Sequence, residues 1–163
     1  MAERLQPPHG AFSFAFREDV TLISLSGSWN YQCAEIYSNI LSQRVAQKPD
    51  KEKTVVFNCT EWGLQTPRTA DRLQELSIEL AKYYRALYIA YITRPEILSI
   101  IQYILRKQYN GVEDVFRWEV FYHLDNARDW LSSLGKSIVP LTLSDFPETI
   151  DATEYAKNMP KHS

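Results

Sequence analysis

Side chains that could carry chemistry gather in one stretch, FNCTEWGLQTPRTADRLQEL, which spans residues 57–76. The hydroxyls of Thr66 and Thr69 could accept a phosphate, or the Thr66 hydroxyl could cap a helix that begins at Pro67. Arg68, together with Arg94 further along the chain, could hold an anion beside helix N-termini. No glycine-rich loop is present to bring backbone amides close to such an anion. We interpret Thr66 as a cap and keep anion binding as an alternative.

Two tryptophans and a cysteine beside this corner allow further interpretations. Trp62 could anchor a partner or line a ligand site, or it could pack at the edge of the core, and for Trp29 packing is favoured. Cys59 ends an apolar run, where burial raises the pKa of a thiol, and His123 has no companion for a catalytic triad. We therefore interpret Cys59 as a core thiol and predict a protein that is not an enzyme.

Composition narrows the classes of function. The chain has 163 residues, 45% of them hydrophobic, which suits one globular domain with a sizeable core. Its 18 Lys and Arg residues against 20 Asp and Glu give a net charge of −2, so nucleic acid is not an expected partner. Two cysteines and three scattered histidines predict no metal and no cofactor. No apolar run reaches the ~18 residues of a membrane span, so we predict a soluble cytoplasmic protein.

The corner must be positioned by strands that alternate with helices along the chain. Apolar residues at alternate positions predict strands, and those spaced by three and four predict helices. Asp125 is the predicted N-cap of the last helix, and Gly135 the residue that follows it. The expected strands are 11–16, 20–27, 54–60, 86–93 and 116–123. The first expected helix carries Ala34, Tyr37, Leu41 and Val45 and is interrupted at Lys48, and the others are 67–85, 95–110 and 126–134.

This order, ββαβαβαβα, predicts an α/β domain with a mixed five-stranded sheet flanked by helices, because helical crossovers join parallel strands. The order, the strand end NCTEW and the closing FRWEVFYHLDNARDWLSSL resemble the STAS-like fold of bacterial anti-sigma-factor antagonists. Ala127, Trp130 and Leu131 resemble the pattern of an uncharacterised bacterial branch of that family. The resemblance covers residues 11–135. Residues 1–10 are predicted to be flexible.

Residues 136–163 form a predicted C-terminal arm that docks in part, with disordered last residues. Prolines and weak periodicity argue against another regular element there. Apolar side chains are expected to dock the arm on the domain: Ile138, Leu141, Leu143 and Phe146.

The resemblance implies a site. STAS regulators dock a kinase at the corner after the third strand, and their switch is a serine at the start of the second helix. Here the matching positions are Pro67 and Arg68, which cannot be phosphorylated, so the resemblance does not carry the switch. Loops after parallel strands meet at one edge of a sheet, which gathers the candidate site residues: Trp29, Trp62, Gln65, Thr66, Arg68, Thr69 and Arg94.

Two functions follow. The favoured one is a regulatory or scaffolding module that binds another protein, such as a signalling regulator, through this corner. The alternative is a carrier or sensor of a small apolar ligand, as in the similar CRAL-TRIO fold, and a pocket above ~300 Å³ between helices and sheet would favour it. Tyrosines could line such a pocket: Tyr83, Tyr84, Tyr88, Tyr91, Tyr103, Tyr109 and Tyr122. A homodimer could form at an exposed edge, through the arm or the first strand.

Overall fold

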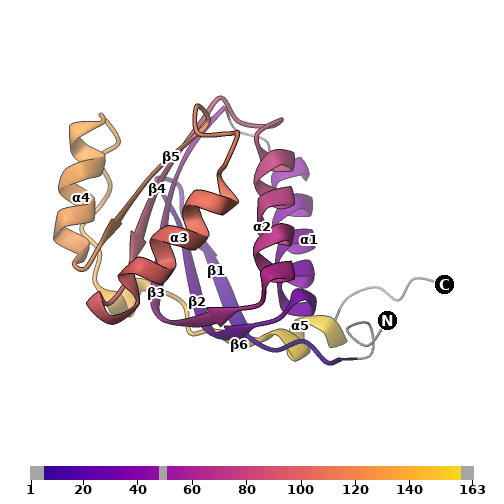
Figure 1. Cartoon of the computed structure of the whole chain (residues 1–163). Helices are drawn as coiled ribbons and strands as arrows, with labels where there is room; N and C mark the ends of the chain where they lie inside the picture. The colour runs from indigo at the N-terminus through magenta and orange to yellow at the C-terminus, as the bar shows by residue number, and fades with distance from the viewer. Residues whose placement is uncertain (1–5, 48–50, 159–163) are drawn as a thin grey trace.

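The computed structural model describes residues 6–47 and 51–158 as a six-stranded sheet with helices on both faces (Figure 1). The strands are β1 (Ala11–Phe16), β2 (Thr21–Trp29), β3 (Glu52–Gln65), β4 (Ala86–Ile92), β5 (Phe116–Phe121) and β6 (Ile150–Asp151). The α-helices are α1 (Tyr31–Gln47), α2 (Pro67–Leu80), α3 (Leu98–Gln108), α4 (Leu124–Ser133) and α5 (Ala152–Lys157). Two 3-10 turns, η2 (Pro95–Ile97) and η3 (Leu143–Asp145), complete the fold.

The strand order across the sheet is β5-β4-β3-β2-β1-β6. Strands β2 to β5 are parallel, β1 pairs antiparallel with β2, and β6 pairs antiparallel with β1. The predicted α/β class with a mixed sheet is therefore confirmed. The sixth strand was not predicted, because it has two residues and exists only through its pairing with Ala11 and Phe12.

Helices α1, α2 and α3 cover one face of the sheet, and α4 lies on the other (Figure 1). Side chains alternate across β3, so Val55 and Phe57 join the cluster under α1 to α3, while Val56 joins the cluster under α4. Both faces are thereby buried, which is why the strands read as apolar runs.

Strand β3 is longer than the pattern predicted, because it continues to Gln65 rather than ending at Thr60. The extension passes the end of β4 and pairs with β2, placing Trp62 opposite Gly27 and Gln65 opposite Trp29. Two register shifts interrupt this pairing. Most of the expected loop is thus strand, since a second chain segment supplies its hydrogen-bond partners.

Helix boundaries also differ from prediction. The expected helix over 95–110 is a 3-10 turn, η2, followed by α3. Helix α2 ends at Leu80, not near Arg85, and tight turns follow. Helix α4 begins at Leu124 with His123 as its N-cap and no side-chain cap hydrogen bond, so the assignment of Asp125 as N-cap was wrong. Asp125 instead lies in the first turn, where a carboxylate favours the positive end of the helix dipole.

The arm after residue 135 lies against the sheet and α4. Phe146 is buried, and Ile138 and Leu141 pack on the cluster under α4. Leu143 lies in the η3 turn and is 56% exposed to solvent, so its predicted docking role was wrong. The Ser13 hydroxyl donates to the Pro147 carbonyl at 3.2 Å, which ties the arm to β1. The predicted disorder of the last residues concerns positions 159–163, outside the described residues.

The segment before β1 is held by one side chain. Asn30 Nδ2 donates to the Pro7 carbonyl at 2.9 Å, and Asn30 Oδ1 accepts from the His9 amide at 3.0 Å. Gly10 follows with φ of +125°, a conformation that L side chains rarely adopt. The chain before β1 is therefore in close contact with the end of β2.

Candidate functional site

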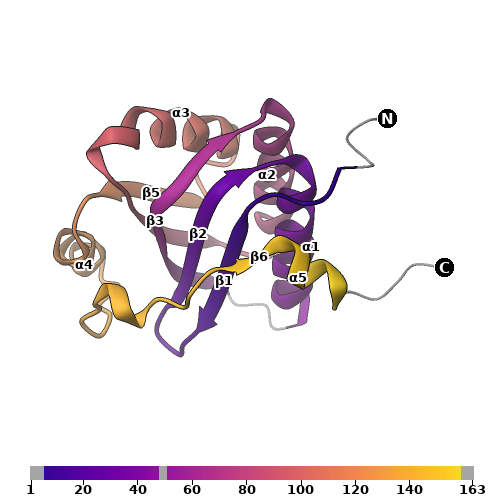
Figure 2. The same cartoon turned by 90° about the horizontal axis from the view of Figure 1, so that it is seen from below.

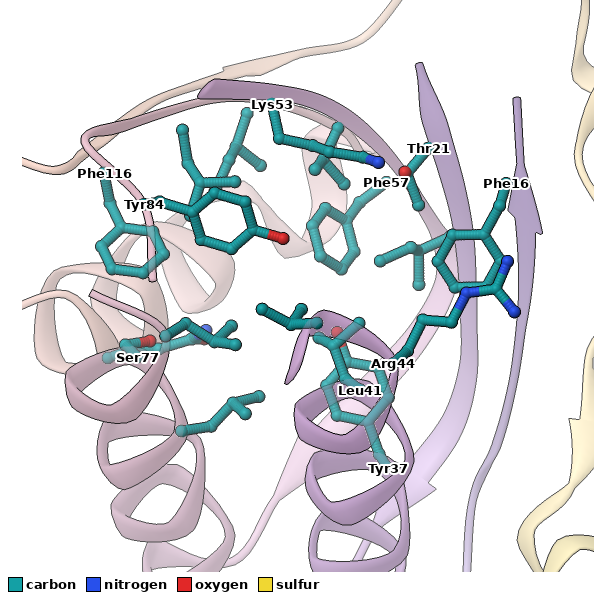
Figure 3. Close-up of a pocket in the computed structure, with 18 of the residues that line it drawn as sticks. Phe16, Thr21, Tyr37, Leu41, Arg44, Lys53, Phe57, Ser77, Tyr84 and Phe116 are labelled. Atoms are coloured by element: carbon teal, nitrogen blue, oxygen red, sulfur yellow. The ribbon is translucent and has the colours of Figure 1, made fainter. Parts of the chain in front are cut away.

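A cavity of about 510 Å³ lies between the sheet and helices α1, α2 and α3 (Figure 3). Its volume falls within the range of roughly 300–1,000 Å³ that is typical of small-molecule sites. Strands β2 to β5 contribute its floor: Thr21, Ile23, Val55, Phe57, Leu87, Ile89 and Phe116. The helices and the turn after α2 contribute its walls: Tyr37, Leu41, Val45, Leu76, Ser77, Leu80, Tyr84, Gln108 and Tyr109.

The cavity lies at the amino ends of the parallel strands. Thr21 begins β2, Phe116 begins β5, and Leu87 is the second residue of β4, and all three line it. The predicted corner follows the carboxyl ends of the same strands, so it lies at the opposite end of the strands from the cavity. The two candidate sites are therefore separate surfaces.

The interior is mostly apolar, with few polar groups. The Ser77 hydroxyl donates to the Leu73 carbonyl at 3.1 Å and is satisfied within α2. Tyr109 and Tyr91 share a hydrogen bond between their hydroxyls, and burial raises the pKa of both phenols. Thr21 Oγ1 is buried without a hydrogen-bond partner, and Figure 3 places Thr21 at the cavity beside Phe57. The Thr21 hydroxyl is thus a polar group that a bound molecule could satisfy.

Charged side chains surround the mouth. The Arg44 guanidinium lies 4.0 Å from the centroid of the Phe16 ring, both residues line the cavity, and Figure 3 shows the two side chains together. Arg17 and Asp145 form an ion pair at 3.4 Å, and Glu18 and Lys53 also border the opening. The lining holds three cations, Arg17, Arg44 and Lys53, and one carboxylate, Glu18. Asp145 lies outside the lining and pairs with Arg17, which leaves this opening a small positive balance.

The two predicted tryptophans at the corner are core residues. Trp29 and Trp62 are each 2% exposed, and their rings meet edge to face with centroids 5.8 Å apart. Trp29 Nε1 donates to the Ser26 carbonyl at 3.0 Å. Trp62 Nε1 is buried and has no hydrogen-bond partner among the described residues. Neither indole is accessible to a partner, so both tryptophans are packing residues of the core.

The threonines at the start of α2 have structural contacts. The Thr66 hydroxyl accepts from the Thr69 amide at 3.3 Å, which confirms that Thr66 is the N-cap with Pro67 in the first turn. Thr69 is fully buried, and its hydroxyl lies 3.3 Å from the Trp29 carbonyl as a donor. A kinase could reach Thr66 but not Thr69 in this conformation.

The remaining corner residues lie at the same edge with different surroundings. The Arg68 guanidinium lies 4.6 Å from the Tyr31 ring centroid, and Arg94 is the exposed N-cap of η2. Gln65 ends β3, and both polar atoms of its amide are buried without a hydrogen-bond partner. The structure thus leaves Thr66, Arg68 and Arg94 as the exposed members of the predicted site.

Cys33 and Cys59 are both free and fully buried. Burial raises the pKa of each thiol, so little thiolate forms near neutral pH. Within residues 6–47 and 51–158, no group of three His, Cys, Asp or Glu side chains could hold a metal ion. In the same described ranges, no helix is long and apolar enough to cross a membrane.

Sequence reasoning found the cavity only as an alternative. Of the tyrosines predicted to line such a space, Tyr84 and Tyr109 do so. Tyr37 also lines it, but its spacing in α1 fits an ordinary helix face equally well. The lining residues come from separate elements, and no local pattern distinguishes a cavity from a filled core.

Comparison with known proteins identifies the fold. No family model and no curated protein matches the chain. The crystal structure of an uncharacterised protein from Shewanella loihica PV-4, of the DUF3478 family and with a SpoIIAA-like fold, is similar, with a TM-score of 0.55 and 16% sequence identity. The match covers 77% of this chain and 96% of that chain. This likeness concerns the path of the backbone.

Proposed function

We propose that this chain, which has a SpoIIAA-like fold, is a non-enzymatic binding module whose cavity takes a small, mainly apolar ligand. The observation that carries the proposal is the cavity of about 510 Å³ between the sheet and α1 to α3. A void of this size in an ordinary core forfeits many packing contacts, and its residues would gain them back on binding a ligand.

The lining favours a ligand with two unlike ends. Apolar strand and helix side chains surround the interior, so an aliphatic or aromatic body fits there. Arg44 and Lys53 at the mouth, beside an Arg17 that already pairs with Asp145, favour a negatively charged end, such as a carboxylate or sulfonate. Thr21 Oγ1 offers one hydrogen-bonding group inside. An amphipathic organic anion therefore matches both the walls and the entrance.

A cavity-filling variant tests this proposal. Leu41→Trp places an indole at the wall of α1, and Ile78→Trp makes the same change on the exposed side of α2, outside the cavity. We measure binding of a naphthyl sulfonate dye whose fluorescence rises in apolar surroundings. Wild type and Ile78→Trp should bind it equally, and Leu41→Trp at least about tenfold more weakly. Native mass spectrometry of the purified protein should reveal a co-purifying organic molecule.

Equal dye affinity in all three proteins, with bare protein in the mass spectra, would contradict the ligand proposal. Near-ultraviolet circular dichroism of each variant excludes a loosened core as the cause of dye fluorescence.

Docking of a regulatory protein at the corner is the second candidate. The observation that favours it is the exposure of Thr66, Arg68 and Arg94 at one edge of the sheet. The fold is in general that of regulatory protein-interaction modules, which supports a partner of this class. With Trp29 and Trp62 in the core, the partner would meet a polar and cationic surface rather than an aromatic anchor.

Charge reversal at the corner tests this second candidate. Arg68→Glu removes the cation beside Tyr31, whereas Lys82→Glu makes the same charge change at an exposed turn away from the corner. In affinity capture from native extract, a partner lost with Arg68→Glu and retained with Lys82→Glu supports docking here. A partner list that is the same for both variants contradicts it.

A further inference from the structure

The two lateral edges of the sheet differ: the C-terminal arm covers one of them, and the other is open. At one edge, β6 pairs with Ala11 and Phe12 of β1, and the arm continues along that side (Figure 2). The Tyr155 hydroxyl donates to the Phe12 carbonyl at 3.0 Å, and Arg17 forms an ion pair with Asp145 of the arm. At the other edge, β5 has β4 on one side, and no strand of the described chain lies on its other side. The arm thus covers β1 and leaves β5 as the open edge.

The backbone of β5 presents alternate residues outward. The Leu87 amide bonds the Val115 carbonyl at 2.8 Å, and the Thr93 amide bonds the Phe121 carbonyl at 2.9 Å. Because hydrogen bonding alternates along a strand, the odd-numbered residues between these points face β4. Trp118 and Val120 therefore direct their amides and carbonyls away from the sheet.

The outward groups of β5 are nearly all available. The Phe116 amide is satisfied by the Val112 carbonyl at 3.1 Å, but its carbonyl also faces outward. Among the described residues, no hydrogen bond reaches the outward groups of Trp118 or Val120. Unpaired edge groups of this kind are a template for another strand, and soluble proteins usually shield them.

The side chains of β5 complement a second copy of the same strand. Arg117 and Glu119 are exposed, both lie on the α4 side of β5, and neither forms an ion pair with the described residues. In an antiparallel pair that places Trp118 opposite itself, Arg117 of one copy lies opposite Glu119 of the other. That position falls between hydrogen-bonded pairs, where facing side chains approach most closely. The two-fold axis produces this contact twice.

We propose that two copies of this chain pair antiparallel through β5, with Trp118 on the two-fold axis and Arg117 facing Glu119 on both sides of it. The sheet then continues from one copy to the other. Trp118 of each copy exchanges both backbone hydrogen bonds with its counterpart, and the Val120 amide of each donates to the Phe116 carbonyl of the other. This edge-to-edge pairing removes the open edge from solvent and is independent of what the cavity binds.

Charge reversal and its rescue test the pairing. By light scattering coupled to size exclusion, the wild type should have twice the mass of the 19.0 kDa chain and dissociate on dilution. Arg117→Glu or Glu119→Arg puts like charges opposite each other twice, and should raise the dimer Kd at least about tenfold. The double variant, Arg117→Glu with Glu119→Arg, should return the Kd to within about threefold of wild type. Lys82→Glu, at an exposed turn, is the control for Arg117→Glu, because it makes the same change of charge.

A second measurement reports the backbone directly. Hydrogen exchange at the Trp118 and Val120 amides should slow as the protein concentration rises through the dimer Kd. Three outcomes overturn the proposal: a monomer at millimolar concentration, a dimer that Arg117→Glu leaves unchanged, or a double variant that stays monomeric. Circular dichroism confirms that each variant is folded, as expected for exposed positions.

Discussion

Arg72 of α2 and Glu35 of α1 form an ion pair that joins the two helices along the helical face of the sheet. Arg72 Nε donates to Glu35 Oε2 at 2.5 Å, and Arg72 Nη2 donates to Asn39 Oδ1 at 3.3 Å. Arg72 is only 8% exposed, so its charge depends on these partners rather than on water. The same helices form walls of the cavity, so this contact contributes to its shape.

Removal of the carboxylate should therefore be costly. We predict that Glu35→Ala lowers the free energy of unfolding by about 2 kcal/mol, because it leaves a largely buried guanidinium with Asn39 as a neutral partner and only a distant, exposed carboxylate, that of Glu75. Glu75→Ala is the matched control: its carboxylate lies 4.0 Å from Arg72 and is 71% exposed, so the expected loss is below about 0.5 kcal/mol. Urea denaturation measures both. Equal losses would show that Glu35 is not the main partner.

Gly10 lies where no side chain fits. A Cβ at this position would overlap the Trp29 ring and lie 2.8 Å from Cys33 Sγ, and the residue has φ of +125°. We predict that Gly10→Ala destabilises the protein by about 3 kcal/mol, through strain and overpacking together. Gly111→Ala has φ of +89° but no atom within 4 Å of the new Cβ, so only about 1 kcal/mol is expected from backbone strain.

The difference between these two glycine variants isolates the steric part of the effect. This difference in stability is measured as the difference between the urea midpoints of the two variants, provided that the free energy of unfolding depends on urea concentration with the same slope in both. Identical midpoints would mean that the chain before β1 shifts away from Trp29 without cost.

Thr66 should tolerate only residues that can cap. We predict that Thr66→Ala lowers the free energy of unfolding by about 1 kcal/mol, because the Thr69 amide loses its side-chain acceptor. Thr66→Asp should be close to neutral, since a carboxylate both caps and favours the helix N-terminus. Thermal unfolding compares the variants. If Thr66→Asp lowered the stability as much as Thr66→Ala, the hydroxyl would matter for another contact, such as its hydrogen bond with Thr69 Oγ1 at 2.8 Å.

Acid should release the arm near η3. The Thr142 amide, donating at 2.7 Å, and then Arg17 hold the pKa of Asp145 below its ordinary value of 3.8. A carboxyl with a lowered pKa in the folded state contributes stability above pH 3.8 and loses it as pH falls through the lower value. We therefore predict that the hydrogen-exchange protection factors of residues 138–149, which are corrected for the intrinsic pH dependence of exchange, fall below pH 3.8, not above it.

The variant Asp145→Asn checks the assignment of this acid step. It cannot titrate and lacks the charge that pairs with Arg17, so exchange in the arm should be faster at neutral pH and less dependent on acid. An acid profile identical to that of the wild type would place the responsible carboxyl elsewhere. Asp151 is the nearest candidate, because hydrogen bonds from Thr153 lower its pKa.

Local patterns in the sequence determined most of the elements. The spacing of Ile101, Ile104 and Leu105 predicts one helix face, and these residues are buried in α3. Alternation in β1 and the apolar run in β4 predict strands because each pattern matches the period of its own backbone. Thr66 with Pro67 predicts a helix start because capping involves only residues close in the chain. Crossover handedness then orders the parallel strands, which is why the fold class could be predicted.

Only the tertiary structure determined which residues are buried, which residues line the cavity and which edge of the sheet is open. Trp62 is buried because β3 runs on beside β2, a pairing between residues 35 positions apart, Gly27 and Trp62. The cavity exists because side chains of Thr21, Leu41 and Tyr84, from three separate segments of the chain, surround a volume that they do not fill. Similarly, the arm covers β1 and not β5 through contacts such as Ser13 with Pro147. Packing of this kind depends on how distant segments meet, and no short stretch of sequence contains it.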